Sequence, residues 1–237
     1  MPFHLYLHMP YCRRKCPYCD FFKKVPHLGE RQQFLTALLK EMKIAAENYS
    51  WPAGSPATIY FGGGTPSLHT SDEISALLSL VRETWGDFNG AEVTLETNPG
   101  TVNFATLQGF RAAGVNRLSI GAQSFAPRKL KMLYRDHTAE ETRDCVQMAR
   151  AAGVLNLSLD LIFGLPGETL EEWRQDIYHA LSLEPEHVSL YNLEFHAGTP
   201  FDRWKNTGRL SPLDEDLEAE MYMMTHEILL EKWFRAL

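Results

Sequence analysis

The sequence has little cysteine for its length, no long apolar run and no excess of positive charge. Only four cysteines occur among 237 residues, which argues against a secreted scaffold held together by disulfides. No apolar stretch reaches the roughly 18–20 residues that a membrane span needs. The net charge of −7 disfavours a general nucleic-acid-binding surface. Because the N-terminus also lacks a signal-peptide pattern, we expect a cytoplasmic protein with no membrane span and no nucleic-acid partner.

Three of the four cysteines, Cys12, Cys16 and Cys19, stand close together in a C-x3-C-x2-C pattern. Because an iron–sulfur cubane and a structural zinc site each normally take four protein ligands, three thiolates leave one position open for a reactant. Zinc held by these cysteines together with His8 or His27 is one interpretation. A [4Fe–4S] cluster fits the spacing better, since zinc fingers usually have two separated pairs of ligands.

Strand and helix patterns alternate along the chain. The expected strands lie at about residues 3–9, 58–61, 92–97, 116–120, 155–163 and 187–193. The expected helices lie at about residues 30–48, 70–85, 103–113, 139–152, 169–183 and 214–234, with a loop after residue 193. Alternating βα units predict an α/β fold with a parallel sheet, and these units fall short of a closed eight-fold barrel. We therefore predict an open, partial (β/α)6 barrel, with a doubly wound sheet as the alternative.

Distinctive residues gather toward the carboxyl ends of the expected strands, which is where parallel α/β proteins form sites. The glycine triplet Gly62–Gly64 follows the second strand and Gln123 follows the fourth, while Glu96 and Asn98 lie at the end of the third strand and Asp160 lies in the fifth. The triplet lacks the G-x4-G-K pattern, so it is not a phosphate loop. It either lets main-chain groups approach a ligand closely or simply forms a tight turn. For Glu96, Gln123 and Asp160 the alternative is a hydrogen-bonded interior network with Arg135 as counter-ion, because a lone buried carboxylate is costly. Cys145, on an apolar helix face, is expected in the core.

Six stretches of the chain carry a family resemblance. They are residues 5–12, 61–67, 94–100, 114–125, 160–167 and 189–194. In this order they resemble the radical S-adenosylmethionine (SAM) family of oxygen-independent coproporphyrinogen III oxidases and their HemW-type relatives, which are proposed haem chaperones. The resemblance implies a radical SAM core domain over residues 1–237, with the family's C-terminal domain absent or truncated.

The resemblance also implies cofactors and roles. Cys12, Cys16 and Cys19 would ligate a [4Fe–4S] cluster whose open iron binds SAM through its amino and carboxylate groups. The residues implied to contact SAM are Tyr6, Gly63, Gly64, Thr65, Glu96, Gln123, Arg135 and Asp160. Haem or a porphyrinogen, an electron donor and haem-accepting proteins would be the partners.

One position departs from the pattern of the decarboxylating oxidases. Their motif continues with a further cysteine two residues after the third ligand, and here that position is Phe21. This departure favours the HemW-type branch and disfavours coproporphyrinogen dehydrogenase activity, so the sequence leaves open whether the chain is an enzyme. A metal-stabilised interaction protein without catalysis is the alternative from another class.

Overall fold

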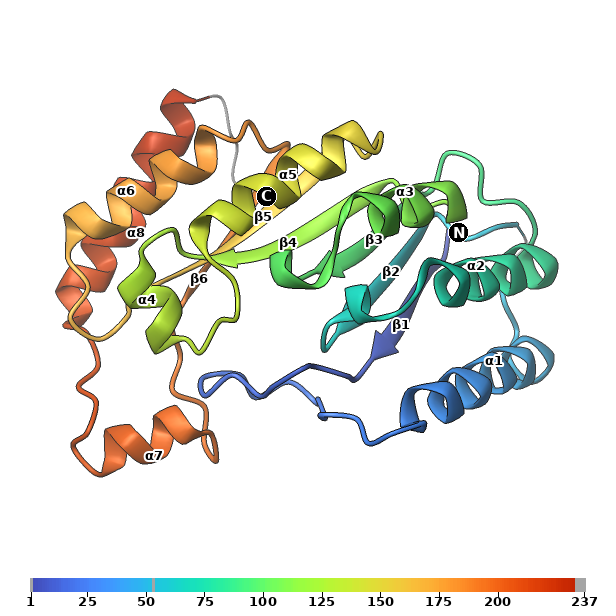
Figure 1. Ribbon diagram of the computed structural model, residues 1–237, viewed down its shortest axis with the longest axis horizontal. Helices are drawn as coiled ribbons and strands as arrows, with labels where there is room; N and C mark the ends of the chain where they lie inside the picture. Colours follow the sequence, from blue (N-terminus) through green and yellow to red (C-terminus); the bar gives the residue numbers. More distant parts are fainter. Residues whose placement is uncertain (1, 53, 233–237) are drawn as a thin grey trace. The chain divides into compact units, whose positions relative to one another are not determined.

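The computed structural model describes residues 2–52 and 54–232. Within them the strands are β1 His4–Met9, β2 Thr58–Gly63, β3 Glu92–Thr97, β4 Arg117–Gln123, β5 Asn156–Phe163 and β6 His187–Asn192 (Figure 1). The α-helices are α1 Glu30–Asn48, α2 Ser71–Trp85, α3 Phe104–Ala113, α4 Pro127–Met132, α5 Ala139–Ala151, α6 Leu170–Leu181, α7 Pro200–Asn206 and α8 Glu215–Glu231. Two short 3-10 helices are η1 Pro66–Leu68 and η2 Pro99–Thr101. None of the described helices is both long and apolar enough to cross a bilayer.

The strands are hydrogen-bonded in one sheet in the order β1-β2-β3-β4-β5-β6. The pairs β1–β2, β2–β3 and β5–β6 are parallel. Each strand thus lies beside the next one along the chain, which is the strand order of a (β/α) barrel. A doubly wound sheet reverses its order part of the way along, so that alternative is excluded. The α/β fold with a parallel sheet, predicted from the alternating patterns, is confirmed.

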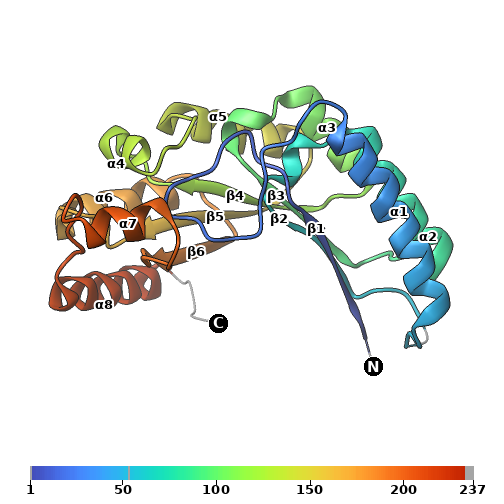
Figure 2. The same ribbon diagram turned by 90° about the horizontal axis from the view of Figure 1, so that it is seen from below.

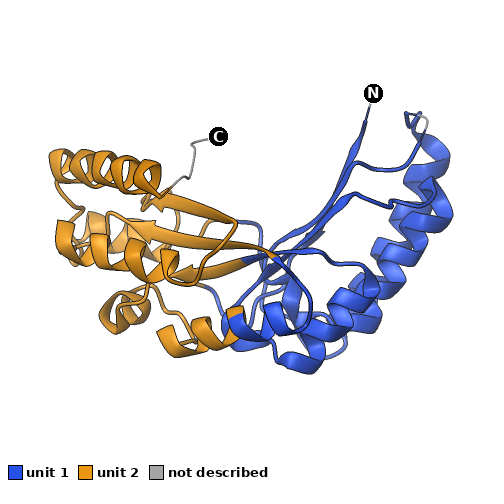
Figure 3. Ribbon diagram, turned by 90° about the horizontal axis from the view of Figure 1, so that it is seen from above, with its two compact units in different colours: residues 1–15, 21–119, 147–155 blue, residues 16–20, 120–146, 156–237 orange. Residues whose placement is uncertain are grey.

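The described chain forms two compact units (Figure 3). Unit 1 consists of residues 1–15, 21–119 and 147–155. Unit 2 consists of residues 16–20, 120–146 and 156–237. The expectation of a single domain over residues 1–237 stays a prediction, and each unit is described by itself below.

Unit 1 has an apolar core on one side of its strands. Its helix α2 packs against both α1 and α3 (Figure 2). Fully buried side chains of the strands and helices include Ile59, Phe61, Leu95, Ile74, Leu77, Leu107 and Phe110. Thr70 begins α2 as its N-cap, because its hydroxyl accepts from the Glu73 amide at 3.2 Å and the Glu73 carboxylate accepts from the Thr70 amide. This capping box is the helix start that the sequence predicts.

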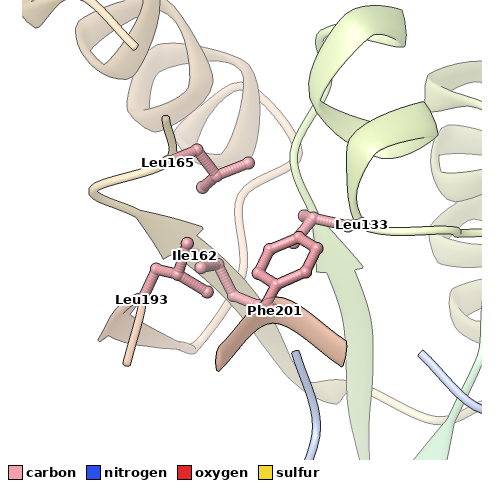
Figure 4. Packing of buried hydrophobic residues seen from close by; sticks show 5 residues of the cluster. All are labelled: Leu133, Ile162, Leu165, Leu193 and Phe201. Atoms are coloured by element: carbon pink, nitrogen blue, oxygen red, sulfur yellow. The ribbon is translucent and has the colours of Figure 1, made fainter. Parts of the chain in front are cut away.

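Unit 2 contains an apolar cluster under its short helix α7. Figure 4 shows the side chains of Leu133, Ile162, Leu165, Leu193 and Phe201, all at most 6% exposed, packed together. The partly buried Tyr18 joins this cluster, with its ring centroid 6.2 Å from that of Phe201. The Phe201 amide also donates to the carbonyl oxygen of Pro17 at 3.0 Å. The second half of the cysteine segment is therefore anchored on a packed hydrophobic core.

Helices α4 and α7 were not predicted. Each spans fewer than eight residues and begins with a proline at its first position, Pro127 or Pro200. The expectation of a loop after residue 193 was wrong at α7, since Thr199 caps a helix there by accepting from the Asp202 amide at 3.2 Å. So short a helix shows no repeated apolar stripe, which is the signal on which sequence patterns depend. The other boundaries differ by a few residues, and residues 233–234 of the last expected helix lie outside the described chain.

Candidate functional site

Cys12 lies in unit 1 directly after β1. Its side chain is 8% exposed and accepts a hydrogen bond from the Thr65 hydroxyl, with 3.5 Å between oxygen and sulfur. Its amide donates to the Lys24 carbonyl at 3.0 Å, and the Lys24 amide donates to the Pro10 carbonyl at 2.7 Å. These backbone bonds fix the start of the cysteine loop, so the position of the Cys12 sulfur is set by main-chain groups.

Cys16 and Cys19 lie in unit 2, where both are partly exposed. The Cys19 amide donates to the Cys16 carbonyl at 3.3 Å, so the two residues form one turn. The guanidinium Nη1 of Arg135 lies 3.8 Å from the Cys16 sulfur. Arg135, one of the residues implied to contact SAM, therefore lies beside one of the three predicted cluster ligands.

The chemistry of these side chains fits a thiolate-bound cluster. All four cysteines are free, which excludes a disulfide framework. Cys145 is fully buried, as predicted for a core residue, and burial raises its pKa to about 12. Among the described residues no three His, Cys, Asp or Glu side chains are grouped as they would be around a metal ion. The assignment of Cys12, Cys16 and Cys19 as ligands therefore stays a prediction.

His8 is less suited to the zinc alternative, because both of its ring nitrogens are engaged. Its Nε2 is 2.9 Å from the Phe22 carbonyl, which can only accept, so this nitrogen carries a proton. In the neutral ring Nδ1 then accepts from the Tyr6 hydroxyl at 3.2 Å. Tyr6 itself is 58% exposed, and both its partial burial and the Glu96 carboxylate raise its pKa. Tyr6 and His8 thus form a polar pair on one face of β1.

The glycine triplet holds the cysteine loop. The Gly64 amide donates to the Met9 carbonyl and the Thr65 amide to the Tyr11 carbonyl, both at 2.8 Å. A Cβ on Gly64 would lie 2.7 Å from the Tyr11 carbonyl oxygen, and one on Gly63 would meet the His8 ring at 2.5 Å. The amides of residues 63–65 are all bonded within the protein. Since the amino group of SAM donates hydrogen bonds, it would need the carbonyl groups here rather than these amides.

We expect Gly64→Ala to reduce cluster loading strongly. The added methyl group would meet backbone carbonyl oxygens of the cysteine loop, which cannot swing away as a flexible side chain does, so the loop must move. Iron and sulfide content after anaerobic reconstitution measure the effect. Gly86→Ala is the control for a general loss of stability, because its φ of 86° makes alanine strained there while the added Cβ meets nothing within 4 Å and lies away from the cysteine loop. Equal iron content in both variants would contradict the role given to Gly64.

Glu96 is a partly buried carboxylate of unit 1. Its Oε1 accepts from the Tyr60 hydroxyl at 2.9 Å and its Oε2 accepts from the Gly63 amide at 3.0 Å. Burial raises the pKa of Glu96, while these two hydrogen bonds and the nearby His8 oppose the rise. The Tyr60 ring stacks on that of Tyr6 at 5.9 Å. Glu96 therefore contacts Gly63 directly and Tyr6 through the Tyr60 ring, so three sequence-predicted positions lie together on neighbouring parallel strands.

Gln123 ends β4 in unit 2 with an unusual backbone. Its φ is 66°, in the left-handed region that residues with a side chain rarely occupy. The Ser124 amide donates across it to the Ala122 carbonyl at 2.8 Å, which makes a γ-turn of the strained, positive-φ kind. Arg135 Nη2 donates to the neighbouring Gly121 carbonyl at 3.0 Å, and its buried Nε has no hydrogen-bond partner. Strain and an unpartnered buried donor are typical of functional sites.

Asp160 lies on β5 opposite Ser189 of β6. The Ser158 hydroxyl donates to the Asp160 carboxylate at 3.4 Å and is 2.9 Å from His187 Nδ1. These side chains make one face of the β5–β6 pair polar. Arg135 donates to the Gly121 carbonyl and lies beside the Cys16 sulfur, and the interior network with Arg135 as counter-ion stays an alternative.

His137 bonds to the carbonyl of Ala122, the residue just before Gln123, as Arg135 does to that of Gly121. Its Nε2 donates to the Ala122 carbonyl at 3.0 Å, and the side chain is buried. Burial, reinforced by the Arg135 charge, lowers the pKa of His137 from 6.5 to about 4. The ring is therefore neutral in the folded protein at neutral pH.

We expect this histidine to make the protein less stable in acid. As pH falls below 6.5, the unfolded chain takes up a proton that the folded chain accepts only near pH 4. The free energy of unfolding should therefore drop by about 3 kcal/mol over that interval. His137→Gln keeps a donor for Ala122 without titrating, so it should lose less stability than the wild type when urea unfolding is compared at pH 7 and pH 4. Parallel losses in the two proteins would contradict the expectation.

A comparison with known protein families identifies the superfamily of this chain. Residues 6–178 match the family model described as the radical SAM superfamily. The chain belongs to the radical SAM superfamily.

Within that superfamily the chain is similar to curated HemW proteins. It is 37% identical over 235 residues to heme chaperone HemW of Escherichia coli, covering 96% of this chain and 59% of that protein. It is 37% identical over 203 residues to heme chaperone HemW of Haemophilus influenzae, covering 84% and 53%. The mouse protein named radical S-adenosyl methionine domain-containing protein 1, mitochondrial, is 36% identical over 231 residues, covering 98% and 52%. The resemblance to the HemW-type branch is confirmed, and the chain spans about half the length of these relatives.

Solved structures give the same fold. Coproporphyrinogen III oxidase (HemN) from Escherichia coli, described as a radical SAM enzyme, matches with a TM-score of 0.85 and 27% identity, covering 97% of this chain and 52% of that one. Elp3 of Methanocaldococcus infernus matches with a TM-score of 0.64 at 17% identity, covering 96% and 55%, and supports the fold alone. The predicted partial (β/α)6 radical SAM barrel is confirmed. Membership of this superfamily implies a [4Fe–4S] cluster and SAM.

Several neighbours of the predicted site residues were missed from the sequence. Tyr60, which donates to Glu96, is the clearest case, and His8, considered from the sequence only as a zinc ligand, pairs with Tyr6. A usable signal was present, because every second residue of a strand faces the same side. Thr58, Tyr60 and Gly62 share one face of β2. In a parallel sheet, the residues paired with them on β1 and β3 lie on the same face. The contact of Arg135 with Cys16 joins residues 119 positions apart and left no such signal.

Proposed function

We propose that this chain is a HemW-type radical SAM protein that holds a [4Fe–4S] cluster through Cys12, Cys16 and Cys19. The observation that carries the choice of branch is Phe21, whose side chain is 69% exposed at the position where the decarboxylating oxidases have a further cysteine. Similarity to several HemW proteins supports the same choice. Haem binding and haem transfer to acceptor proteins are the activity we propose.

We propose that SAM is held by groups suited to its charges. The partly buried Glu96 carboxylate, fixed by Tyr60 and Gly63, would attract the positive amino or sulfonium group. Gln123, Arg135 and Asp160 are the proposed contacts from unit 2, and the others from unit 1 are Tyr6, Gly63, Gly64 and Thr65. When bound, the cluster and SAM supply one-electron cleavage of SAM to methionine and a 5′-deoxyadenosyl radical. The protein ligates, orients and shields these groups.

The surface of unit 1 next to Cys12 suits haem as a ligand. Phe21 and Phe22 are 69% and 80% exposed. Five basic residues, Arg13, Arg14, Lys15, Lys23 and Lys24, lie in the same stretch of a chain whose net charge is −7. Exposed aromatic rings provide a surface for a flat tetrapyrrole, and basic side chains attract its carboxylates. An acidic electron donor is a further partner that this stretch would attract.

The test is anaerobic reconstitution followed by haem titration. We expect about four iron and four sulfide ions per chain, an electron paramagnetic signal that changes when SAM is added, and stoichiometric haem binding followed by absorbance. Transfer of the bound haem to apomyoglobin would measure the chaperone activity directly. A chain that takes up a full cluster but leaves haem absorbance unchanged would overturn the haem assignment.

Oxidative decarboxylation of coproporphyrinogen III is the second candidate. The structural similarity to coproporphyrinogen III oxidase of Escherichia coli favours it, while Phe21 disfavours it. Product analysis with coproporphyrinogen III under reducing, anaerobic conditions decides between the two, because protoporphyrinogen forms only if the chain is an oxidase. One zinc ion and no iron after metal analysis would instead support the interaction protein without catalysis.

A further inference from the structure

A buried ionic network lies in unit 2 outside the residues assigned to cofactors. Lys129 of α4 is fully buried and forms ion pairs with Glu168 and with Asp176 of α6, the latter at 2.5 Å. The side chains of all three are at most 2% exposed. A buried salt bridge is often no more stabilising than apolar residues of the same volume. Stability alone therefore does not explain the network, and its geometry points to a different role.

The Asp176 carboxylate holds the two residues that follow Gln123. Its Oδ2 accepts from the Ser124 hydroxyl at 2.6 Å, and its Oδ1 accepts from the Phe125 amide at 2.7 Å. The Ser124 hydroxyl oxygen in turn accepts from the Ala126 amide at 3.0 Å. Both carboxylate oxygens are thus used to fix the backbone immediately after the γ-turn.

The turn is held on its other side as well. Arg135 and His137 donate to the carbonyls of Gly121 and Ala122, the two residues before Gln123. A residue with a side chain keeps such a strained conformation only where its surroundings enforce it. Here the surroundings are the Asp176 carboxylate, which accepts from the residues after Gln123, and the Arg135 and His137 side chains, which donate to the residues before it.

Lys129 also connects this turn to the end of β5. The Glu168 carboxylate, its second partner, accepts from the Leu165 amide at 2.9 Å. Leu165 lies in the turn that follows β5, the strand that carries Asp160. Lys129 therefore links the segment after β4, which ends at Gln123, to the segment after β5, which carries Asp160.

We propose that Asp176 and Lys129 are positioning residues that hold Gln123 in its strained turn and so direct its side chain toward SAM. This inference rests on the proposed function, in which Gln123 contacts SAM. Asp176 acts through the backbone of Ser124 and Phe125, and Lys129 supplies the positive charge that keeps the Asp176 carboxylate in place.

A double-mutant cycle on the reconstituted chain tests the proposal. Asp176→Asn and Gln123→Ala should each raise the dissociation constant for SAM about tenfold. If Asp176 acts through Gln123, the double variant should bind SAM no more weakly than Gln123→Ala alone. Multiplied effects in the double variant, or an unchanged dissociation constant for Asp176→Asn, would overturn the proposal.

Two further measurements separate positioning from general damage. Hydrogen exchange of the apo chain should show faster exchange at the Phe125 amide in Asp176→Asn, because that amide loses a charged acceptor. Cys145→Ala is the matched control, since it shortens a fully buried side chain of unit 2 on α5, outside the ionic network. It should leave SAM affinity unchanged, and weakened binding in this control would count against the proposal.

The variants also distinguish a failure of the proposed function from a failure of the positioning role alone. If Asp176→Asn does not fold, Ser124→Ala replaces it, since that change removes only one of the bonds to the carboxylate. A wild-type chain with a full cluster that does not bind SAM would refute the proposed function itself. A wild-type chain that binds SAM, beside an Asp176→Asn variant that binds it equally well, would refute the positioning role alone.

Discussion

Replacing Cys16 with alanine is expected to remove the iron–sulfur cluster almost completely. A three-cysteine site has no spare protein ligand, so losing one thiolate leaves two bonds to hold a charged cluster. Iron and sulfide should fall from about four per chain to near zero after anaerobic reconstitution, and the broad cluster absorbance should disappear with them. Arg135 Nη1 then loses its partner at 3.8 Å, which leaves a half-buried cation less well satisfied.

Cys145→Ala is the control for this experiment. The residue is fully buried in the core, and burial raises its pKa to about 12, so it is a small apolar side chain rather than a ligand. The variant should lose about 1 kcal/mol of stability and keep its full iron content. A Cys16→Ala chain that retains a complete cluster responsive to SAM would refute the assignment of the ligands.

Glu96→Gln is expected to weaken SAM binding by about a hundredfold. The change removes the partly buried negative charge, and the single amide oxygen cannot accept from both Tyr60 and Gly63 as the carboxylate does. Losing a buried, hydrogen-bonded charge partner costs about 2–5 kcal/mol of binding free energy. Equilibrium dialysis or calorimetry with SAM on the reconstituted chain measures the loss.

The pH dependence of SAM binding gives a second test of Glu96. Because burial raises the pKa of Glu96, its carboxylate takes up a proton at a higher pH than an exposed one would. A cationic ligand should therefore bind less tightly as pH falls through that raised pKa, and Glu96→Gln should remove this dependence. Glu92→Gln is the matched control on the same face of β3, where the carboxylate is 43% exposed and accepts from Thr94. Equal losses in the two variants would contradict a specific role for Glu96.

Much of the fold was predictable because its signals are local. A helix such as α2 repeats its apolar side chains every three or four residues, and Thr70 and Glu73 mark its start three positions apart. The alternation of strands and helices then requires a parallel sheet, whose order follows from the sequence of the units. The short helix α7 was missed because it has neither the length nor the stripe that such patterns need.

The site was predictable only in part, for a related reason. Cysteine spacing and a glycine triplet are visible in a few consecutive residues, and so are polar residues at strand ends. The hydrogen bond from Tyr60 to Glu96 joins two strands, and the contact of Arg135 with Cys16 joins residues 119 positions apart. We propose that the strained turn at Gln123 depends on Asp176, which lies 53 positions later, on helix α6. Such contacts are products of tertiary packing and leave no periodic trace in the sequence.

The guanidinium beside Cys16 has a consequence for electron transfer. Positive charge and hydrogen bonds at a cluster's sulfur ligands stabilise its reduced form, which carries one more negative charge. If Cys16 ligates the cluster as we propose, Arg135 would make its reduction potential less negative, and a weaker reductant would suffice to reduce it. The same shift would leave less driving force for electron transfer to SAM. The position of this one side chain would thus set how the driving force is shared between cluster reduction and SAM cleavage.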